Sequence, residues 1–363
     1  MKPMTQVKST KHESQGVMTA AVLYGAEDLK IERVGIPTVA DDEILVRVQV
    51  ALTCGTDLKV WKQGSHPRMI QPPAIFGHEL SGIVEETGRL VDETIRAGMR
   101  VVPSNSAPCC SCMFCRKEQP NLCEDLLFNN GAYAEYMRIP GRIVRQNLLE
   151  VPDHVSFRDA AMVEPLACVL RGIDETQIRP GDTAVVVGCG PIGLKFIRIL
   201  SGRDVRVIAL GKRKSQIEAA ERLGAYAAFD VSEMDSPVSI VRHLTEGGRG
   251  ADAVIEAVGS PSTWQWAIEM VRKGGRVNLF GGCPRGTQVQ FDPGLLHYSE
   301  ITIKATFHHT PRFIREALDT ISRGEVRASD FITGEIPLAD LPRVFEHMKH
   351  RNGELKTAVI PWA

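Results

Sequence analysis

Residues 183–201 read TAVVVGCGPIGLKFIRILS, an apolar run followed by a glycine-rich turn and an amphipathic segment. The run is short and β-branched, which predicts a buried strand. Pro191 suits the first turn of a helix, where its missing N–H would have no partner, so the segment after it is predicted to be helical. Together they indicate one strand–turn–helix unit of a parallel sheet covered by helices.

The same alternation continues along the chain. Further apolar runs lie at 205–210, 251–259 and 276–282, and helix-like segments lie between them at 214–224 and 262–275. Buried strands that alternate with helices are typical of a doubly wound parallel sheet. We therefore predict an α/β domain with a doubly wound parallel sheet over residues 165–309.

The N-terminal part has a different pattern. Short β-branched segments, separated by Gly, Pro and Asp, occur at 19–25, 43–53, 82–88 and 99–104. Strands joined by hairpin-length gaps favour an antiparallel sheet or barrel, so residues 18–164 are predicted to form a β-rich domain in an α/β protein. After residue 310 the pattern is mixed, with a helix expected at 312–324 and a closing strand at 355–362.

Length and composition agree with two globular domains. The chain has 363 residues, 43% of them apolar and 24% charged, and its formal net charge of −1 argues against nucleic acid as a partner. No apolar stretch is long enough to span a membrane. Residues 1–17 are polar and lack the apolar centre of a secretory signal, so we expect a disordered tail and a cytoplasmic protein.

The glycines Gly188, Gly190 and Gly193 stand between the predicted strand and helix. Glycine lets the backbone turn tightly and approach a pyrophosphate, and the helix that starts at Pro191 and Ile192 presents free N–H groups to that anion. These five residues therefore predict a dinucleotide site. The alternative is a purely structural glycine-rich turn.

The residue after the second strand of such a domain selects between NAD and NADP. NAD-binding proteins place an acid there to hold the adenosine ribose. This chain has Gly211, followed by Lys212, Arg213 and Lys214. Cations in place of a carboxylate suit the 2′-phosphate, so NADP(H) is favoured over NAD(H). A solvated basic start of the next helix is the alternative.

Four of the nine cysteines, Cys109, Cys112, Cys115 and Cys123, form one cluster, with Cys110 wedged between the first two. In a reducing compartment such a cluster is typical of metal binding and not of disulfides. Four thiolates at these spacings can surround a tetrahedral ion and leave no open position, which predicts a structural zinc site.

Other metal-binding residue types lie far apart in the chain. Cys54 stands in LTCGTD, His78 and Glu79 follow an apolar run, and Glu164 stands in VEPLAC. Each alone has a structural explanation, as a buried cysteine, a hydrogen-bonded histidine or a solvated acid. Together, a thiolate, an imidazole and carboxylates suit a zinc ion with an open or exchangeable position.

The motifs CGTD, GHE, GAYAEY, VEPLA and EAVG, with the cysteine cluster and the glycine turn, carry a family resemblance. From Met18 onward the chain resembles the zinc-dependent medium-chain dehydrogenase/reductase superfamily, and within it the sorbitol (polyol) and threonine dehydrogenase branch. The resemblance implies a GroES-like catalytic domain at 18–164 with a structural zinc lobe at about 105–125. It also implies a Rossmann cofactor-binding domain at 165–309 and a return of the chain to the catalytic domain at 310–363. It also implies a homodimer or homotetramer.

By the same resemblance each chain would hold two zinc ions. Cys54 and His78 would bind the catalytic ion, and Glu79 would adjoin or join them. Glu164 occupies the position where many alcohol dehydrogenases of the superfamily have a cysteine ligand, and Cys168 is a weaker candidate for that role. Whether Glu79 or Glu164 ligates the ion stays open.

Proton transfer is also interpreted from the resemblance. Thr56 matches the relay hydroxyl that accepts the proton of the substrate. Many relatives continue the relay through a histidine five residues after the cysteine, but this chain has Lys59 there, so the exit route stays open.

His308 and His309 follow ITIKATF, the predicted last strand of the Rossmann sheet. Ligands bind at the carboxyl ends of such strands, so we expect at least one imidazole to line the cleft near the nicotinamide and to titrate near neutral pH. In the polyol dehydrogenases that the chain resembles, the matching positions hold polar side chains beside the cleft. A solvated turn is the alternative.

These expectations combine into a zinc-dependent oxidoreductase. It would transfer a hydride between a small secondary alcohol (a polyol, sugar or amino alcohol) and NADP(H), giving the ketone. One alternative is a simple alcohol dehydrogenase or ketone reductase, which Glu164 disfavours. Another is a zinc-stabilised NADP(H)-binding protein without catalysis. The sequence does not name the substrate.

Overall fold

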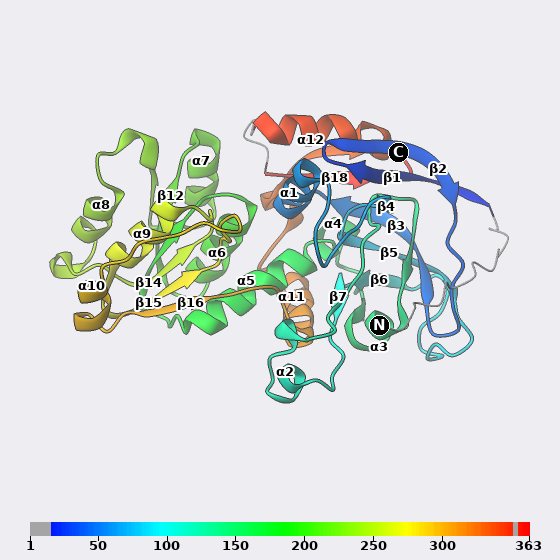
Figure 1. Ribbon diagram of the computed structural model, residues 1–363, viewed down its shortest axis with the longest axis horizontal. Helices are drawn as coiled ribbons and strands as arrows, with labels where there is room; N and C mark the ends of the chain where they lie inside the picture. The colour runs from blue at the N-terminus through cyan, green and yellow to red at the C-terminus, as the bar shows by residue number, and fades with distance from the viewer. Residues whose placement is uncertain (1–15, 351–354) are drawn as a thin grey trace, which may run out of the picture.

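The computed structural model describes residues 16–350 and 355–363, so most of the predicted tail lies outside the described residues. The first strand, β1, spans Val17–Gly25 and begins one residue before the predicted domain. Figure 1 shows a β-rich part at the right and a helix-covered sheet at the left, with helices α5 and α11 between them. The first and last described strands, β1 and β18 (Lys356–Ile360), both lie in the β-rich part.

The β-rich part is built on a seven-stranded sheet with the path β10-β6-β5-β3-β18-β17, and β9 pairs with β3. Its strands are β3 (Ile44–Leu52), β5 (Glu79–Thr87), β6 (Arg100–Pro103), β9 (Tyr136–Ile139), β10 (Leu148–Glu150), β17 (Ile332–Pro337) and β18 (Lys356–Ile360). A smaller sheet holds β1, β2 (Asp28–Gly35) and β4 (Ala74–Ile75), and β7 (Ser106–Ala107) pairs with β8 (Leu127–Phe128). β3 and β5 are antiparallel, as the sequence pattern predicts.

The last strand, β18, lies inside the main sheet. It pairs antiparallel with β3, where Ala358 faces Leu52, and parallel with β17. Ala358 and Val359 are fully buried, and the indole N–H of Trp362 donates to the carbonyl of Val48 at 2.8 Å. The end of the chain therefore completes the sheet that the first hundred residues begin.

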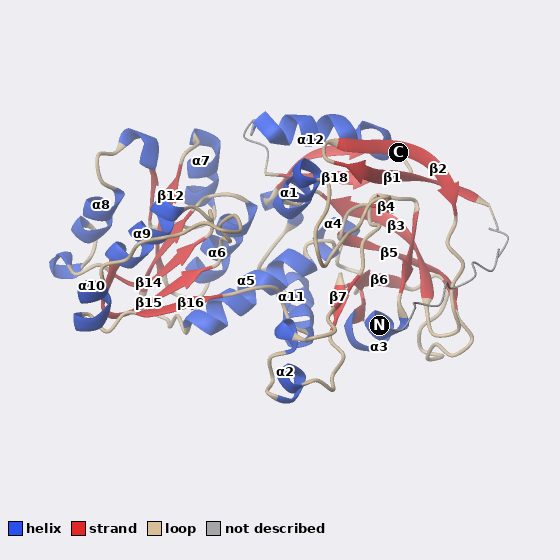
Figure 2. Ribbon diagram, viewed as in Figure 1, coloured by secondary structure: helices blue, strands red, loops and turns tan. Residues whose placement is uncertain are grey.

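The second sheet is parallel, with the order β13-β12-β11-β14-β15-β16. Its strands are β11 (Thr183–Val187), β12 (Arg206–Gly211), β13 (Ala227–Asp230), β14 (Ala251–Glu256), β15 (Val271–Leu279) and β16 (Thr302–Ala305). The order reverses between β11 and β14, and in sheets of this kind the ligand binds in the crevice outside such a point. Figure 2 shows helices on both faces of this sheet, as predicted.

The helices fall into three groups. The β-rich part carries α1 (Gly55–Gln63), α2 (Met113–Arg116), α3 (Gly141–Asn147), α4 (Phe157–Ala160) and α12 (Leu341–His350). The parallel sheet is covered by α6 (Pro191–Ser201), α7 (Lys214–Arg222), α8 (Pro237–His243), α9 (Pro261–Met270) and α10 (Pro293–Tyr298), and α5 (Val163–Thr176) and α11 (Pro311–Ser322) lie at the junction. In the part of the chain that the structure describes, no helix is both long and apolar enough to cross a membrane.

One helix prediction was too long. The segment 262–275 was expected to be helical throughout, but α9 ends at Met270 and Val271 already has the extended backbone of β15. The pair Gly274 and Gly275 explains the difference, because Gly274 adopts a left-handed φ of 68°, which a helix does not contain.

A single hydrophobic cluster crosses the junction. Leu52 of β3, Leu166 and Val169 of α5, and Phe196 of α6 all belong to it. The buried amide of Asn278 on β15 donates to two acceptors on α5, the carbonyl of Gly172 and the hydroxyl of Thr176. The two sheets are therefore packed against a shared core.

Candidate active site

Cys54, His78 and Glu79 meet where β3 ends and β5 begins. One ligand atom of each lies within 4.8 Å of the other two. Leu52 pairs with Glu79 across the strands, so the register of the sheet brings the two segments side by side. Cys54 caps α1, and its sulfur accepts a hydrogen bond from the N–H of Thr56 at 3.4 Å.

The ring of His78 is held by a buried acid. Its Nδ1 lies 2.8 Å from Oδ1 of Asp57, and the hydroxyl of Tyr133 lies 2.6 Å from the other Asp57 oxygen. This leaves Nε2 as the ring nitrogen that Asp57 does not hold, the arrangement found behind metal-binding histidines. Burial opposes a charged ring, but Asp57 and the Cys54 thiol outweigh it and hold the pKa of His78 well above its usual value. The site therefore attracts positive charge.

Glu79 is fully buried and has two different oxygens. One forms an ion pair with the ammonium of Lys356, which also donates to the carbonyl of Thr53 at 2.7 Å. The other oxygen is buried and has no hydrogen-bond partner. A buried, unpaired carboxylate oxygen beside a thiol and an imidazole fits a divalent cation, so these residues suit the zinc ion that the sequence predicts.

Glu164 lies in an adjoining group with Cys168 and His308, whose ligand atoms are also within 4.8 Å of one another. The amide of Asn105 donates to Oε1 of Glu164 at 3.1 Å. Burial raises the pKa of Glu164 to about 7, with His78 lowering it and Glu79 raising it. The candidate ligands therefore fall into two groups, with Glu164, Cys168 and His308 in the second.

His308 and His309 do not form a solvated turn. His309 is 2% exposed, and its Nε2 lies 2.9 Å from Oδ1 of Asn105 and 3.2 Å from the hydroxyl of Ser104. His308 is half-buried, and its Nε2 lies 2.6 Å from the hydroxyl of Ser106. Both side chains thus reach from the end of the Rossmann sheet to the β-rich domain. Whether either contacts the nicotinamide stays a prediction.

The expected titration of these imidazoles near neutral pH was wrong. Burial lowers the pKa of His308 to about 3 and the pKa of His309 well below its usual value, and nearby cations lower both further. The rings are therefore neutral at physiological pH. Sequence reasoning missed this because burial at the junction depends on packing between segments two hundred residues apart.

The residues of the predicted proton relay lie on helix α1. Thr56 is exposed on the first turn of α1, two residues from Cys54. Lys59 is exposed on the same helix. The structure therefore leaves both side chains accessible to solvent beside the candidate metal site, and the role of Thr56 stays a prediction.

The four-cysteine lobe has the geometry of a tetrahedral site. The sulfurs of Cys112 and Cys115 are 3.6 Å apart, and the pairs Cys109–Cys115 and Cys112–Cys123 are each 3.9 Å apart. Zinc–sulfur bonds of about 2.3 Å in a tetrahedron place the sulfurs about 3.8 Å apart, so the spacing fits one ion. All four cysteines are free of disulfides.

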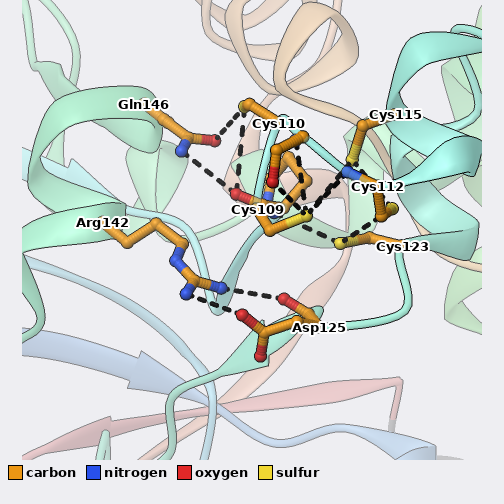
Figure 3. A network of polar contacts seen from close by, with 10 residues as sticks. Cys109, Cys110, Cys112, Cys115, Cys123, Asp125, Arg142 and Gln146 are labelled. Carbon is orange, nitrogen blue, oxygen red and sulfur yellow. Dashed lines mark hydrogen bonds and ion pairs between the residues drawn. The ribbon is translucent and has the colours of Figure 1, made fainter.

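The fifth cysteine of the lobe points elsewhere. Figure 3 shows the sulfur of Cys110 directed toward Gln146, whose Oε1 lies 3.5 Å away. An ion pair of 2.8 Å between Arg142 and Asp125 stabilises the neighbouring loop (Figure 3).

Hydrogen bonds from the N–H and hydroxyl of Ser111 lower the pKa of Cys109 to about 6, which favours the thiolate that binds zinc.

The glycine turn has the shape that a dinucleotide needs. Gly188 has a left-handed φ of 105°, and a Cβ on Gly193 would lie 1.7 Å from the carbonyl oxygen of Gly188. A Cβ on Gly190 would meet nothing within 4 Å, which leaves open space at the start of α6. Pro191 and Ile192 form the first turn of that helix. The residues therefore fit a pyrophosphate at the helix N-terminus.

The end of β12 carries the predicted specificity residues. Gly211 is the last residue of β12, Lys212 is exposed and Arg213 is half-buried. Gly211 pairs with Asp230, the last residue of β13, so a carboxylate lies on the neighbouring strand end. Sequence reasoning did not consider Asp230. Hydrogen bonds from the side chain and N–H of Ser232 lower the pKa of Asp230, and Lys212 lowers it further.

Three residues around the metal site were not assigned a role from the sequence. Asp57 stands in CGTD and Tyr133 in GAYAEY, so their motifs were visible although their contact with His78 was not. Lys356 had no local signal, because its partner Glu79 is 277 positions away in the chain.

Comparisons with known proteins agree with this geometry. A family described as "Alcohol dehydrogenase GroES-like domain" matches residues 40–153, and one described as "Zinc-binding dehydrogenase" matches 191–323. An erythritol/L-threitol dehydrogenase from Mycolicibacterium smegmatis is 31% identical over 95% of this chain and 98% of its own. The chain belongs to the zinc-dependent alcohol dehydrogenase superfamily. It is an oxidoreductase that acts on CH–OH groups.

Other members of this superfamily are similar over nearly their whole length. A sorbitol dehydrogenase from Bacillus subtilis is 27% identical over 95% of this chain and 97% of its own. A structure from Sinorhizobium meliloti, described as a zinc-binding dehydrogenase bound to NADP, has a TM-score of 0.86 and 30% identity, and covers 96% of this chain and 100% of that one. The GroES-like and Rossmann fold class is therefore confirmed.

We expect protein purified without chelators to contain two zinc ions per chain. Cys54→Ser should lose one ion and about a thousandfold or more of the activity while keeping the fold, because the charge stabilisation at the substrate is lost. Cys112→Ser should lose the other ion and lower the unfolding temperature, because the lobe has little apolar packing. Metal analysis and thermal melts measure both.

Cys110→Ser is the matched control for the lobe. Its sulfur faces Gln146 and not the other four sulfurs, so both ions and the melting temperature should be unchanged. One zinc ion or none in the unmutated protein would contradict the assignment of two sites.

Proposed function

We propose that the protein oxidises a secondary alcohol of a polyol, sugar or amino alcohol to the ketone with NADP⁺, or runs the reverse reaction. The observation that carries the proposal is the convergence of Cys54, His78 and Glu79, with Glu164 in the adjoining group. Cys54 lies after β3, and His78 and Glu79 lie at the start of β5, whereas Glu164 of α5 belongs to the second group with Cys168 and His308.

Cys54 and His78 would hold the catalytic zinc ion. Glu79 and Glu164 are the two carboxylates that could complete its coordination. When bound, zinc polarises the substrate oxygen and the nicotinamide accepts the hydride. Asp57 holds the ring of His78 in orientation, and Lys356 pairs with one oxygen of Glu79 while the other oxygen has no hydrogen-bond partner.

Proton transfer falls to residues at the solvent side. The hydroxyl of Thr56 would take the proton of the substrate alcohol and pass it to solvent, since Thr56 is exposed. Lys59 stands where many relatives have a histidine, so the proton would leave through solvent at Thr56. His308 and His309, neutral at physiological pH, would line the cleft as hydrogen-bonding groups and not as acids.

A polar substrate is supported by two observations. Position 164 holds a carboxylate, and the amide of Asn105 and the hydroxyls of Ser104 and Ser106 lie beside the two histidines. The relatives named above act on sorbitol and on erythritol or threitol, which are polyols. Two zinc ions per chain, a cytoplasmic location and a homodimer or homotetramer complete the proposal.

A simple alcohol dehydrogenase is the second candidate. An alcohol dehydrogenase from Thermus sp. ATN1 has a TM-score of 0.86 and 28% identity to this chain, and covers 94% of this chain and 99% of that one. A substrate panel separates the two candidates directly.

The test is a spectrophotometric panel of polyols, sugars, amino alcohols and simple alcohols, with NADP⁺ and NAD⁺. We expect the highest kcat/KM for a compound with neighbouring hydroxyl or amino groups, and the reaction should need Cys54. A preference for ethanol or propan-2-ol would favour the second candidate. If the protein turns over no alcohol or ketone, the alternative of an NADP(H)-binding protein without catalytic activity would be favoured.

The cofactor preference is tested at Gly211. A Cβ there would lie 2.9 Å from Cδ1 of Ile217, so Gly211→Asp should be combined with Ile217→Val to make room. With Lys212→Ser and Arg213→Ser added, the preference should move from NADP(H) toward NAD(H) by about tenfold or more in kcat/KM, because a phosphate-binding charge is replaced by an acid.

Ile217→Val alone is the control and should keep the original preference. If the unmutated protein already uses NAD⁺ better than NADP⁺, the basic residues after Gly211 do not bind a 2′-phosphate. In that case Asp230 becomes the acid to test next, since it lies at the neighbouring strand end.

A further inference from the structure

Asn105 is a buried residue whose side-chain amide contacts two of the candidate site residues. It lies between β6 and β7 in the β-rich part and is 2% exposed. Its Nδ2 donates to Oε1 of Glu164 on α5 at 3.1 Å, and its Oδ1 lies 2.9 Å from Nε2 of His309, which follows β16. One side chain therefore connects the β-rich part, the helix at the junction and the end of the Rossmann sheet.

Hydrogen bonds fix the loop that carries Asn105. Asn147 contacts this loop on both sides: its carbonyl accepts from the N–H of Ser104 at 2.9 Å, and its amide donates to the carbonyl of Ser106 at 2.7 Å. The N–H of Asn129 donates to the carbonyl of Asn105 at 2.8 Å. The β-rich part therefore sets the point from which the Asn105 side chain extends, independently of its two partners.

The donors and acceptors of these groups decide which end of the amide faces which partner. An ionised carboxylate only accepts, so Glu164 requires the NH2 end of Asn105. The amide oxygen then faces His309, so the ring donates from Nε2. Nδ1 of His309 is buried and has no hydrogen-bond partner, and a buried N–H without an acceptor is rare in proteins. The ring is therefore the tautomer with its proton on Nε2.

Asn105 holds one oxygen of Glu164 and leaves the other free. In the part of the chain that the structure describes, no group donates a hydrogen bond to Oε2, and the side chain of Glu164 is 12% exposed. Carboxylates that bind metals are themselves held by hydrogen bonds, which fix their direction. Nε2 of His309 lies 3.9 Å from Oε1, too far for a hydrogen bond, so Asn105 is the link between them.

We propose that Asn105 is a positioning residue, which holds Glu164 in the orientation that it uses at the catalytic site, and that the Nε2–H tautomer of His309 in turn holds Asn105. The inference rests on the proposed function, because it needs Glu164 to act there. Asn105 acts through Glu164 and not on the substrate itself. Loss of its amide should therefore change the metal site and the turnover together, through one carboxylate.

The experiment uses cobalt(II) in place of zinc at the catalytic site of the whole protein, with zinc kept in the four-cysteine lobe. It measures cobalt affinity by competition with a chelator, the visible spectrum of the bound cobalt, and kcat for the best alcohol of the substrate panel. Asn105→Ala should lower the cobalt affinity or kcat by about tenfold to a hundredfold, and it should alter the spectrum, because Glu164 is no longer held in one orientation.

A double-mutant cycle separates this role from simple packing. If Asn105 acts through Glu164, then Asn105→Ala should change cobalt affinity and kcat by no more than about twofold in a protein that already carries Glu164→Ala. Losses that multiply would overturn the inference. Asn129→Ala is the matched control, because it removes the same type of side chain from the neighbouring strand end and keeps the backbone bond to Asn105. It should leave the spectrum and kcat unchanged.

Two substitutions at His309 test the second half of the inference. The amide nitrogen of a glutamine lies near the place of Nε2 and can donate to Asn105, whereas a leucine has no donor. His309→Leu should therefore alter the cobalt spectrum as Asn105→Ala does, and His309→Gln should restore the original spectrum. Equal spectra for the two His309 variants would contradict this half.

Nitrogen NMR of the zinc protein with labelled histidines tests the tautomer of the unmutated chain, and decides the matter if Asn105→Ala does not fold. The signal that disappears in His309→Gln should show a proton on Nε2 and none on Nδ1. A proton on Nδ1 would overturn the inference, as would unchanged cobalt binding and kcat in folded Asn105→Ala. A protein that binds no metal through Cys54, or turns over no alcohol, would instead overturn the proposed function.

Discussion

The buried ion pair between Glu79 and Lys356 is the contact on which the site depends. It joins β5 to β18, two strands from opposite ends of the sequence, beside the thiol of Cys54 and the ring of His78. Without the lysine, Glu79 would be a buried, uncompensated carboxylate, which is strongly destabilising. With it, one carboxylate oxygen is satisfied and the other stays free. The sheet can therefore bury these candidate metal ligands together, although the negative charges among them would otherwise repel one another.

The same constraint explains why the chain returns to the β-rich part. Lys356 begins β18, and this strand fits between β3 and β17. The strand supplies apolar packing through Ala358 and Val359 and, at its first residue, the cation. The strands of the Rossmann sheet thus lie in the sequence between two segments that share one sheet of the β-rich part, and a common hydrophobic core with α5 and α6 packs the two parts together.

The sequence correctly predicted features that depend on residues close together in the chain. The cysteine lobe, the glycine turn and most strands depend on spacing or periodicity within a few residues, and the sulfur distances and the backbone of Gly188 agree with them. It failed where a property depends on distant packing. The pKa of His308 is lowered by burial at the junction, and the partners of Glu79 and Gly211 lie on strands that no local pattern connects.

Transfer of deuterium tests the central claim most directly. A polyol substrate labelled with deuterium on its secondary carbon is incubated with the protein and oxidised cofactor, and the mass of the reduced nicotinamide is measured. The account predicts one deuterium on the nicotinamide of every cofactor reduced and a ketone as the other product. Reduced cofactor without the label, or no reduction by a protein that contains both zinc ions, would contradict it.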